Sequence, residues 1–140
     1  MVLDLSSLRR AVGSLELSTR VALEAADDPN LSEAQLITIR AGVIQHFEFT
    51  YELCWKFMKR WLKEVAGRND VDGIARRELF RIAAQEKLID DPVCWFDMHT
   101  ARNRSTHVYN EAIASEVLSF ALVFAPEASS LLTRLEQRND

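Results

Sequence analysis

The stretch from Ser32 to Val65 constrains the fold most, because it contains no proline and only one glycine, Gly42. Its apolar residues recur every three or four positions, which is the spacing of one face of an α-helix. Ser32 and Gln35 have the spacing of a capping box, and Gly67 is a suitable residue for the end of a helix. The sequence therefore predicts one long helix over residues 32–65.

The apolar residues of this helix cover an unusually wide arc. At 100° per residue they span about 240° of its circumference, whereas a surface helix needs an arc of only about 100°. The residues concerned are Val43, Ile44, Phe47, Phe49, Tyr51, Leu53, Cys54, Trp55, Phe57, Met58, Trp61, Leu62 and Val65. We therefore expect the helix either to lie at the centre of a bundle or to pack against a second subunit as well.

Four further helical patterns flank the long one. They cover residues 6–26, 74–85, 91–102 and 110–135, and the last continues in phase across Pro126, where we expect one helix with a kink. Asp91 and Pro92 suit the first positions of the fourth. Short connections between helices are typical of antiparallel bundles. The sequence thus predicts an all-α, antiparallel, four- to five-helix up-and-down bundle in a single domain, residues 1–140.

Composition limits the class of protein. A chain of 140 residues, 48% of them hydrophobic, can bury a core without disulfides or metals, so we expect Cys54 and Cys94 to be reduced thiols. The net charge of −4 provides no general attraction for nucleic acid. No uninterrupted apolar run approaches the roughly 20 residues of a membrane span. We expect a cytoplasmic protein that does not contact a membrane.

The chemistry is concentrated in residues 102–109, Arg-Asn-Arg-Ser-Thr-His-Val-Tyr. Arginine binds phosphate oxygens through a planar, permanently charged fork, and histidine transfers protons near neutral pH. His99, Arg102 and Asn103 share one helical face. Arg102 lies about 140° from His107 on an ideal helix, so the two can meet on one ligand only if the helix ends or bends between them, or if two chains share the pocket.

The same spacing also fits an ordinary solvated helix end. In that interpretation Arg102 and Arg104 interact with the negative end of the helix dipole, and His107 bonds a carbonyl group. Spacing alone leaves both interpretations open.

The stretch resembles the signature of the HEPN superfamily, in which an arginine and a polar residue are followed by a few variable residues and a histidine. Arg102, Asn103 and His107 match it. With Tyr109 added, the pattern resembles HEPN toxins encoded beside minimal nucleotidyltransferases. Residues 47–55, 77–83 and 88–89 are similar to the same branch, so the resemblance covers most of residues 5–135.

The resemblance implies a HEPN-like bundle and a homodimer whose two motifs meet in a cleft. It implies a metal-independent endoribonuclease without a cofactor, in which Arg102 holds the scissile phosphate, His107 transfers the proton and Asn103 orients the phosphate or His107. A cognate nucleotidyltransferase antitoxin would neutralise this toxin by transferring AMP to Tyr109. Close relatives of this branch are instead described as non-catalytic, substrate-binding subunits of a two-chain nucleotidyltransferase, and a scaffolding role is a third interpretation.

Other polar residues are weaker candidates. His46, His99 and Arg104 are candidates for lining the cleft, although His46 also suits the core, and the three histidines have no metal-ligand spacing. Glu48 and Glu52 are interpreted as a solvated, ion-paired face with Lys56. The basic cluster of Arg76, Arg77 and Arg81 is interpreted as ordinary surface, with contact to RNA or a partner as the alternative.

Overall fold

The computed structural model describes residues 2–107 and 109–140, so Met1 and Val108 lie outside the described residues. Within these ranges the chain forms five α-helices, a short 3-10 turn and no strand. The elements are α1 (Ser6–Ala26), α2 (Glu33–Glu64), α3 (Arg76–Gln85), α4 (Pro92–Arg104), η1 (Ser105–His107) and α5 (Glu111–Gln137). The predicted all-α fold is confirmed.

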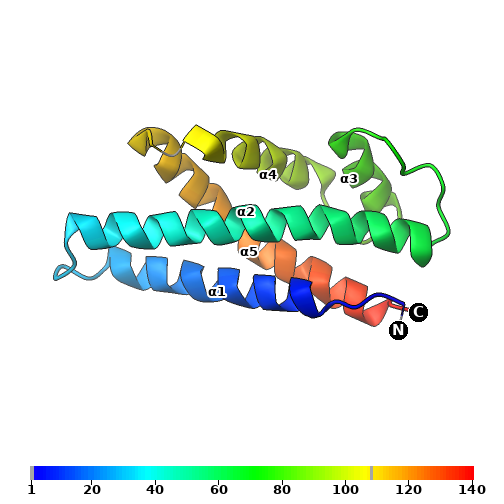
Figure 1. Cartoon of the computed structure of the whole chain (residues 1–140), viewed down its shortest axis with the longest axis horizontal. Coiled ribbons are helices and arrows are strands. Elements are labelled where there is room, and N and C mark those ends of the chain that lie inside the picture. Colours follow the sequence, from blue (N-terminus) through cyan, green and yellow to red (C-terminus); the bar gives the residue numbers. More distant parts are fainter. Residues whose placement is uncertain (1, 108) are drawn as a thin grey trace.

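The long helix α2 lies at the centre of the bundle. It packs against α1, α3, α4 and α5, with α1 along one side and α3 and α4 along the other (Figure 1). Contacts on several sides account for most of its wide apolar arc. Phe49 is an exception, since 60% of its surface is exposed.

The helix ends follow the signals in the sequence. Ser32 Oγ accepts a hydrogen bond from the backbone N–H of Gln35 at 3.1 Å, and the Gln35 side chain accepts one from the backbone N–H of Ser32 at 2.8 Å. Gly67 follows α2 with a φ of 71°, a conformation that favours glycine. Asp91 caps α4 through the N–H of Val93. The predicted capping box, glycine and cap are therefore confirmed.

We expect Ser32→Ala to lower the free energy of unfolding by about 1 kcal/mol. The substitution leaves the N–H of Gln35 without its partner at an exposed helix end. Urea denaturation of the variant and the wild type measures the difference. Ser130→Ala, an exposed change within α5, is the control, and an equal effect of both changes would contradict the capping role.

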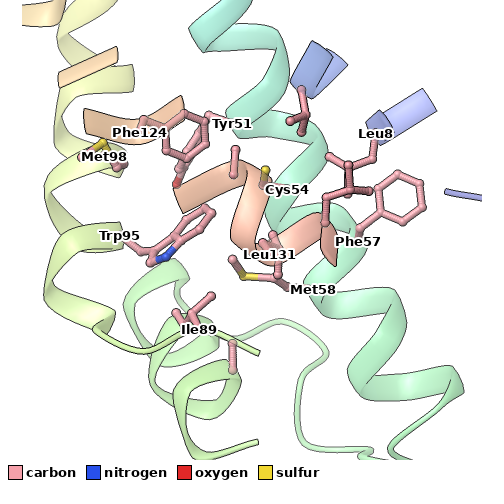
Figure 2. Close-up of a cluster of buried hydrophobic side chains, with 14 of the residues drawn as sticks. Leu8, Tyr51, Cys54, Phe57, Met58, Ile89, Trp95, Met98, Phe124 and Leu131 are labelled. Atoms are coloured by element: carbon pink, nitrogen blue, oxygen red, sulfur yellow. The ribbon is translucent and has the colours of Figure 1, made fainter. Parts of the chain in front are cut away.

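The core between α2, α4 and α5 is an aromatic cluster. Phe124 packs edge-on against both Phe47 and Trp95, with ring centroids 5.3 Å apart in each pair. Tyr51 adjoins Phe124 at 6.2 Å, and all four side chains are fully buried. Figure 2 shows Tyr51, Trp95 and Phe124 side by side, each from a different helix. This cluster fixes α4, which carries the motif, against the central helix.

Helix α5 continues through Pro126 as the sequence predicts. In the described part of the chain, α5 is the one helix long and apolar enough by length and composition to cross a membrane. It also packs against α1, α2 and α4 and contributes Phe124 and Leu131 to the core. An apolar helix at the centre of a bundle has the same composition, so length and composition alone do not distinguish the two.

The two ends of the chain are joined by hydrogen bonds. Asn139 is 5% exposed; its side chain accepts from the N–H of Leu3 at 2.8 Å and donates to the carbonyl of Leu3 at 2.9 Å. The N–H of Val2 donates to the carbonyl of Asn139. The ends therefore lie together at one end of the bundle, as Figure 1 shows.

Candidate functional site

The motif lies where α4 changes into a tighter turn. The α-helix ends at Arg104, and Ser105–His107 form η1. The N–H of Ser105 donates to the carbonyls of Ala101 and Arg102, and Thr106 Oγ1 donates to the carbonyl of Asn103. The regular helix thus ends between Arg102 and His107. The two side chains are therefore not held about 140° apart around the axis, as they would be on an ideal helix. This is one of the conditions under which the two side chains can act on one ligand.

Arg102 is held by two carboxylates of α2. Its Nη1 lies 3.1 Å from Glu48 Oε2, and its Nε lies 3.4 Å from Glu52 Oε1. Among the described residues Nε makes no hydrogen bond, so the contact with Glu52 is an ion pair only. Both carboxylates are partly buried, which weakens the screening of these charges by solvent. The guanidinium is therefore oriented from one side.

Ser105 links the turn to the same carboxylate. Its hydroxyl contacts Glu48 Oε2 at 2.9 Å and the carbonyl of Arg102 at 2.6 Å, and it is 2% exposed. Arg102 Nη1 also donates to this hydroxyl at 3.3 Å. Glu48 thereby connects α2 to both Arg102 and η1.

The interpretation of Glu48 and Glu52 as a solvated face paired with Lys56 was wrong. Both are partly buried, and their cationic partner is Arg102, far away in the sequence. Glu52 also accepts a hydrogen bond from Trp55 Nε1 at 2.9 Å. In the sequence, their burial is indicated only by the neighbouring aromatic residues Phe47, Tyr51 and Trp55. The packing of α4 on α2 then shows that their partner is Arg102.

His99 belongs to a hydrogen-bonded group behind the motif. Its Nδ1 is hydrogen-bonded to Tyr51 Oη at 2.7 Å, and its Nε2 lies 3.5 Å from Asn103 Nδ2. Burial and the positive charge of Arg76 lower the pKa of His99 below its usual value, whereas burial raises the pKa of Tyr51. The lowered pKa favours the neutral form of His99. Asn103, which is predicted to orient the phosphate or His107, thus also contacts His99.

The lowered pKa of His99 predicts a specific loss of stability in mild acid. The folded chain binds fewer protons than the unfolded chain just below the ordinary histidine pKa of about 6.5, so the free energy of unfolding falls as pH decreases through this value. We expect His99→Gln to reduce this fall. Urea denaturation at several pH values from about 7.5 down to 5 measures it. The variant also loses the hydrogen bond to Tyr51, which lowers its stability at every pH. The readout is therefore how steeply the free energy of unfolding changes with pH, and a variant with the same steepness as the wild type would contradict the prediction.

His107 and Tyr109 lie together on the surface. Their rings are edge to face, with centroids 6.0 Å apart and an interplanar angle of 81°. His107 is exposed, and 84% of the Tyr109 surface is accessible. An imidazole and a phenol beside each other are thus open to a large substrate or a second protein.

The remaining candidates lie elsewhere. Arg104 Nη1 pairs with Glu116 of α5 at 2.7 Å, so its charge is directed away from Glu48. His46 lines a groove between α1 and α2 with Ser18 and Thr38, and it is partly exposed rather than part of the core. Arg102 and His99 thus contact α2, Asn103 contacts His99, and His46 lies in a different groove.

No cluster of metal-ligating side chains is found in the described part of the chain. Over residues 2–107 and 109–140, no three histidine, cysteine, aspartate or glutamate side chains form a group that could hold an ion. Cys54 is buried and Cys94 is partly exposed, and both are free thiols.

Comparison with known proteins identifies the family. Residues 3–137 match the model of the family described as nucleotidyltransferase substrate binding protein like. The chain belongs to this family. A relative from Haemophilus influenzae, named probable ribonuclease HepT, is 38% identical over 103 residues, which cover 73% of this chain and 70% of the relative. The predicted resemblance to the HEPN branch encoded beside minimal nucleotidyltransferases is confirmed.

Two solved structures of similar proteins support this assignment. HI0074 from Haemophilus influenzae, described as having the fold of a substrate binding domain of a nucleotidyltransferase, superposes with a TM-score of 0.89 at 32% identity and covers 96% of this chain and 100% of its own. A protein from Thermus thermophilus gives a TM-score of 0.65 at 26% identity. The match covers 86% of this chain and 98% of the Thermus thermophilus chain. The chain is therefore similar both to a protein named for ribonuclease activity and to a protein described by substrate binding.

Proposed function

We propose that this family member is a HEPN endoribonuclease and the toxin of a toxin–antitoxin pair. The observation that carries the proposal is the arrangement of the motif: Arg102 is oriented by Glu48, and His107 is exposed on the turn that follows. The name of the Haemophilus influenzae relative supports the same activity. The expected homodimer would bring two such motifs to one cleft.

The chemistry follows from the two side chains. The 2′-hydroxyl of the RNA attacks the adjacent phosphorus, and His107 takes up its proton. Arg102 stabilises the negative charge that develops on the phosphate oxygens. The bond from phosphorus to the 5′-oxygen breaks, and that oxygen takes up a proton from solvent. In this step His107 is the base, Arg102 stabilises the developing charge, and solvent is the acid.

Tyr109 is the proposed point of control. Its hydroxyl would attack the α-phosphorus of ATP on a cognate nucleotidyltransferase, forming a phosphodiester to AMP and releasing pyrophosphate. The 84% exposure of Tyr109 allows another protein to reach it, and its ring adjoins His107. The added charge and bulk would then obstruct the motif.

The second candidate is a non-catalytic subunit that presents substrate to a nucleotidyltransferase. The description of the family and of HI0074 favours it, and the net charge of −4 suits it better than RNA binding.

RNA cleavage by the purified, unmodified chain tests the proposal. We expect fragments in the presence of EDTA and growth arrest of cells that express the chain alone. Incubation with the cognate nucleotidyltransferase and Mg-ATP should stop cleavage and add the mass of AMP at Tyr109. Tyr109→Phe should escape both effects while still cleaving RNA. If unmodified protein cleaves no RNA and expression is harmless, the substrate-binding subunit is the better account.

A further inference from the structure

Three arginines of α3 stack on aromatic side chains of neighbouring helices. The Arg76 guanidinium carbon lies 3.5 Å from the ring centroid of Trp55 on α2. Those of Arg77 and Arg81 lie 4.9 Å and 5.4 Å from the centroid of Phe96 on α4. These cation–π contacts hold each guanidinium over a ring while its N–H groups can still donate hydrogen bonds. We refer to Arg76, Arg77 and Arg81 as the α3 arginine surface.

This surface has an excess of positive charge. Across residues 2–107 and 109–140, neither Arg76 nor Arg77 has a carboxylate within 4.0 Å, whereas Arg81 pairs with Glu78 at 3.3 Å. Most other arginines of the bundle have such partners: Arg9, Arg60, Arg68, Arg102, Arg104 and Arg134. Two consecutive arginines of one helix that have no carboxylate partner in the described structure, in a chain of net charge −4, favour a bound anion over internal ion pairing.

The surface is contiguous with the motif. Glu52 contacts Arg102 with one carboxylate oxygen and Trp55 with the other, and Arg76 covers the Trp55 ring. A second route follows α4, where Phe96 and Asn103 share a helical face with His99 between them. Seven residues of helix span about 10 Å, so the arginine surface and Asn103 are close enough for one RNA strand to contact both.

We infer that the α3 arginine surface binds the backbone phosphates of the RNA that flank the scissile phosphate at Arg102 and His107. This inference rests on the proposed ribonuclease function. The arginines themselves cover the faces of Trp55 and Phe96, which leaves donors for phosphate oxygens rather than open rings for base stacking. The contact is therefore electrostatic and independent of base sequence, and it explains how an acidic chain holds a polyanion.

The test uses His107→Ala as the parent, so that bound RNA is not cleaved. Binding of a short, single-stranded oligoribonucleotide of mixed sequence is measured by fluorescence anisotropy between about 50 and 200 mM salt. Arg76→Gln with Arg77→Gln in this parent is compared with a matched control, Arg9→Gln with Arg60→Gln. Each pair removes two positive charges, but Arg9 and Arg60 are paired with Glu136 and Glu64.

We expect the Arg76→Gln, Arg77→Gln variant to bind RNA at least about tenfold more weakly at low salt. The slope of log K against log salt concentration should fall in magnitude by about 1.4, because each phosphate contact on a single strand contributes about 0.7. The control pair should change the slope little. A structural role of the α3 arginines would not produce a selective change in slope, and thermal unfolding of both variants checks that they are folded.

Three other outcomes contradict the inference in distinguishable ways. Equal affinities and slopes for the two pairs would overturn it and leave the ribonuclease proposal intact. If the α3 pair keeps its RNA affinity but no longer binds the cognate nucleotidyltransferase, the surface is a protein interface. If the His107→Ala parent binds no RNA, the proposed function fails and the inference fails with it.

Discussion

Replacing His107 by alanine is expected to slow RNA cleavage by about 100- to 10,000-fold, the usual contribution of a general acid or base. His107 lies on η1 with its imidazole exposed, so the change removes the proton acceptor without opening a cavity in the core. The initial rate of cleavage of a fluorogenic RNA by purified, unmodified protein measures the loss. Cells that express the variant should grow normally.

The chain provides a matched control for this experiment. His46 is a partly exposed histidine outside the motif, in the groove between α1 and α2. We expect His46→Ala to cleave RNA at the wild-type rate. Arg102→Ala should also abolish cleavage, but it leaves Glu48 and Glu52 without their partner and is less specific. A His107→Ala protein as active as the wild type would remove His107 from the mechanism.

Phe124→Ala is expected to lower the free energy of unfolding by about 3–5 kcal/mol. Phe124 is fully buried and contacts Phe47, Tyr51 and Trp95, so the change opens a cavity where α2, α4 and α5 meet. Domains of this size are stable by about 5–15 kcal/mol, so the loss is a large part of the total. Urea denaturation followed by circular dichroism measures it.

The residue next to Phe124 serves as the control. Val123 is 56% exposed on the same helix, and Val123→Ala should change stability by no more than about 0.5 kcal/mol. If both variants lose a comparable free energy of unfolding, the loss comes from substitution anywhere in α5 and not from the aromatic cluster.

Local signals predicted those helix ends well that are marked by capping residues. Ser32, Asp91 and Gly67 act within a few residues of their own positions, and the structure confirms all three. The start of α3 was less clear: the pattern suggested about Ile74, and the helix begins at Arg76. Its N-cap residue is Ala75, which has no side-chain group to mark the boundary.

The site was predictable only in part. Residues 102–109 show the motif directly, but the partners of Arg102 are separated from it by about 50 residues of sequence. Glu48 and Glu52 have a helical spacing that also fits a solvated face, and only the packing of α4 on α2 distinguishes the two. The same holds for Arg76, whose aromatic partner Trp55 belongs to another helix.

The hydrogen bonds between Leu3 and Asn139 make the bundle suitable for circular permutation. A short linker could join the adjacent ends, and the chain could be reopened in the exposed connection around Asp28 between α1 and α2 without interrupting a helix. In Figure 1 this connection lies at the opposite end of the molecule from the termini. The natural and permuted chains would therefore present fusion points at opposite ends, so a reporter could be attached at either end of the bundle.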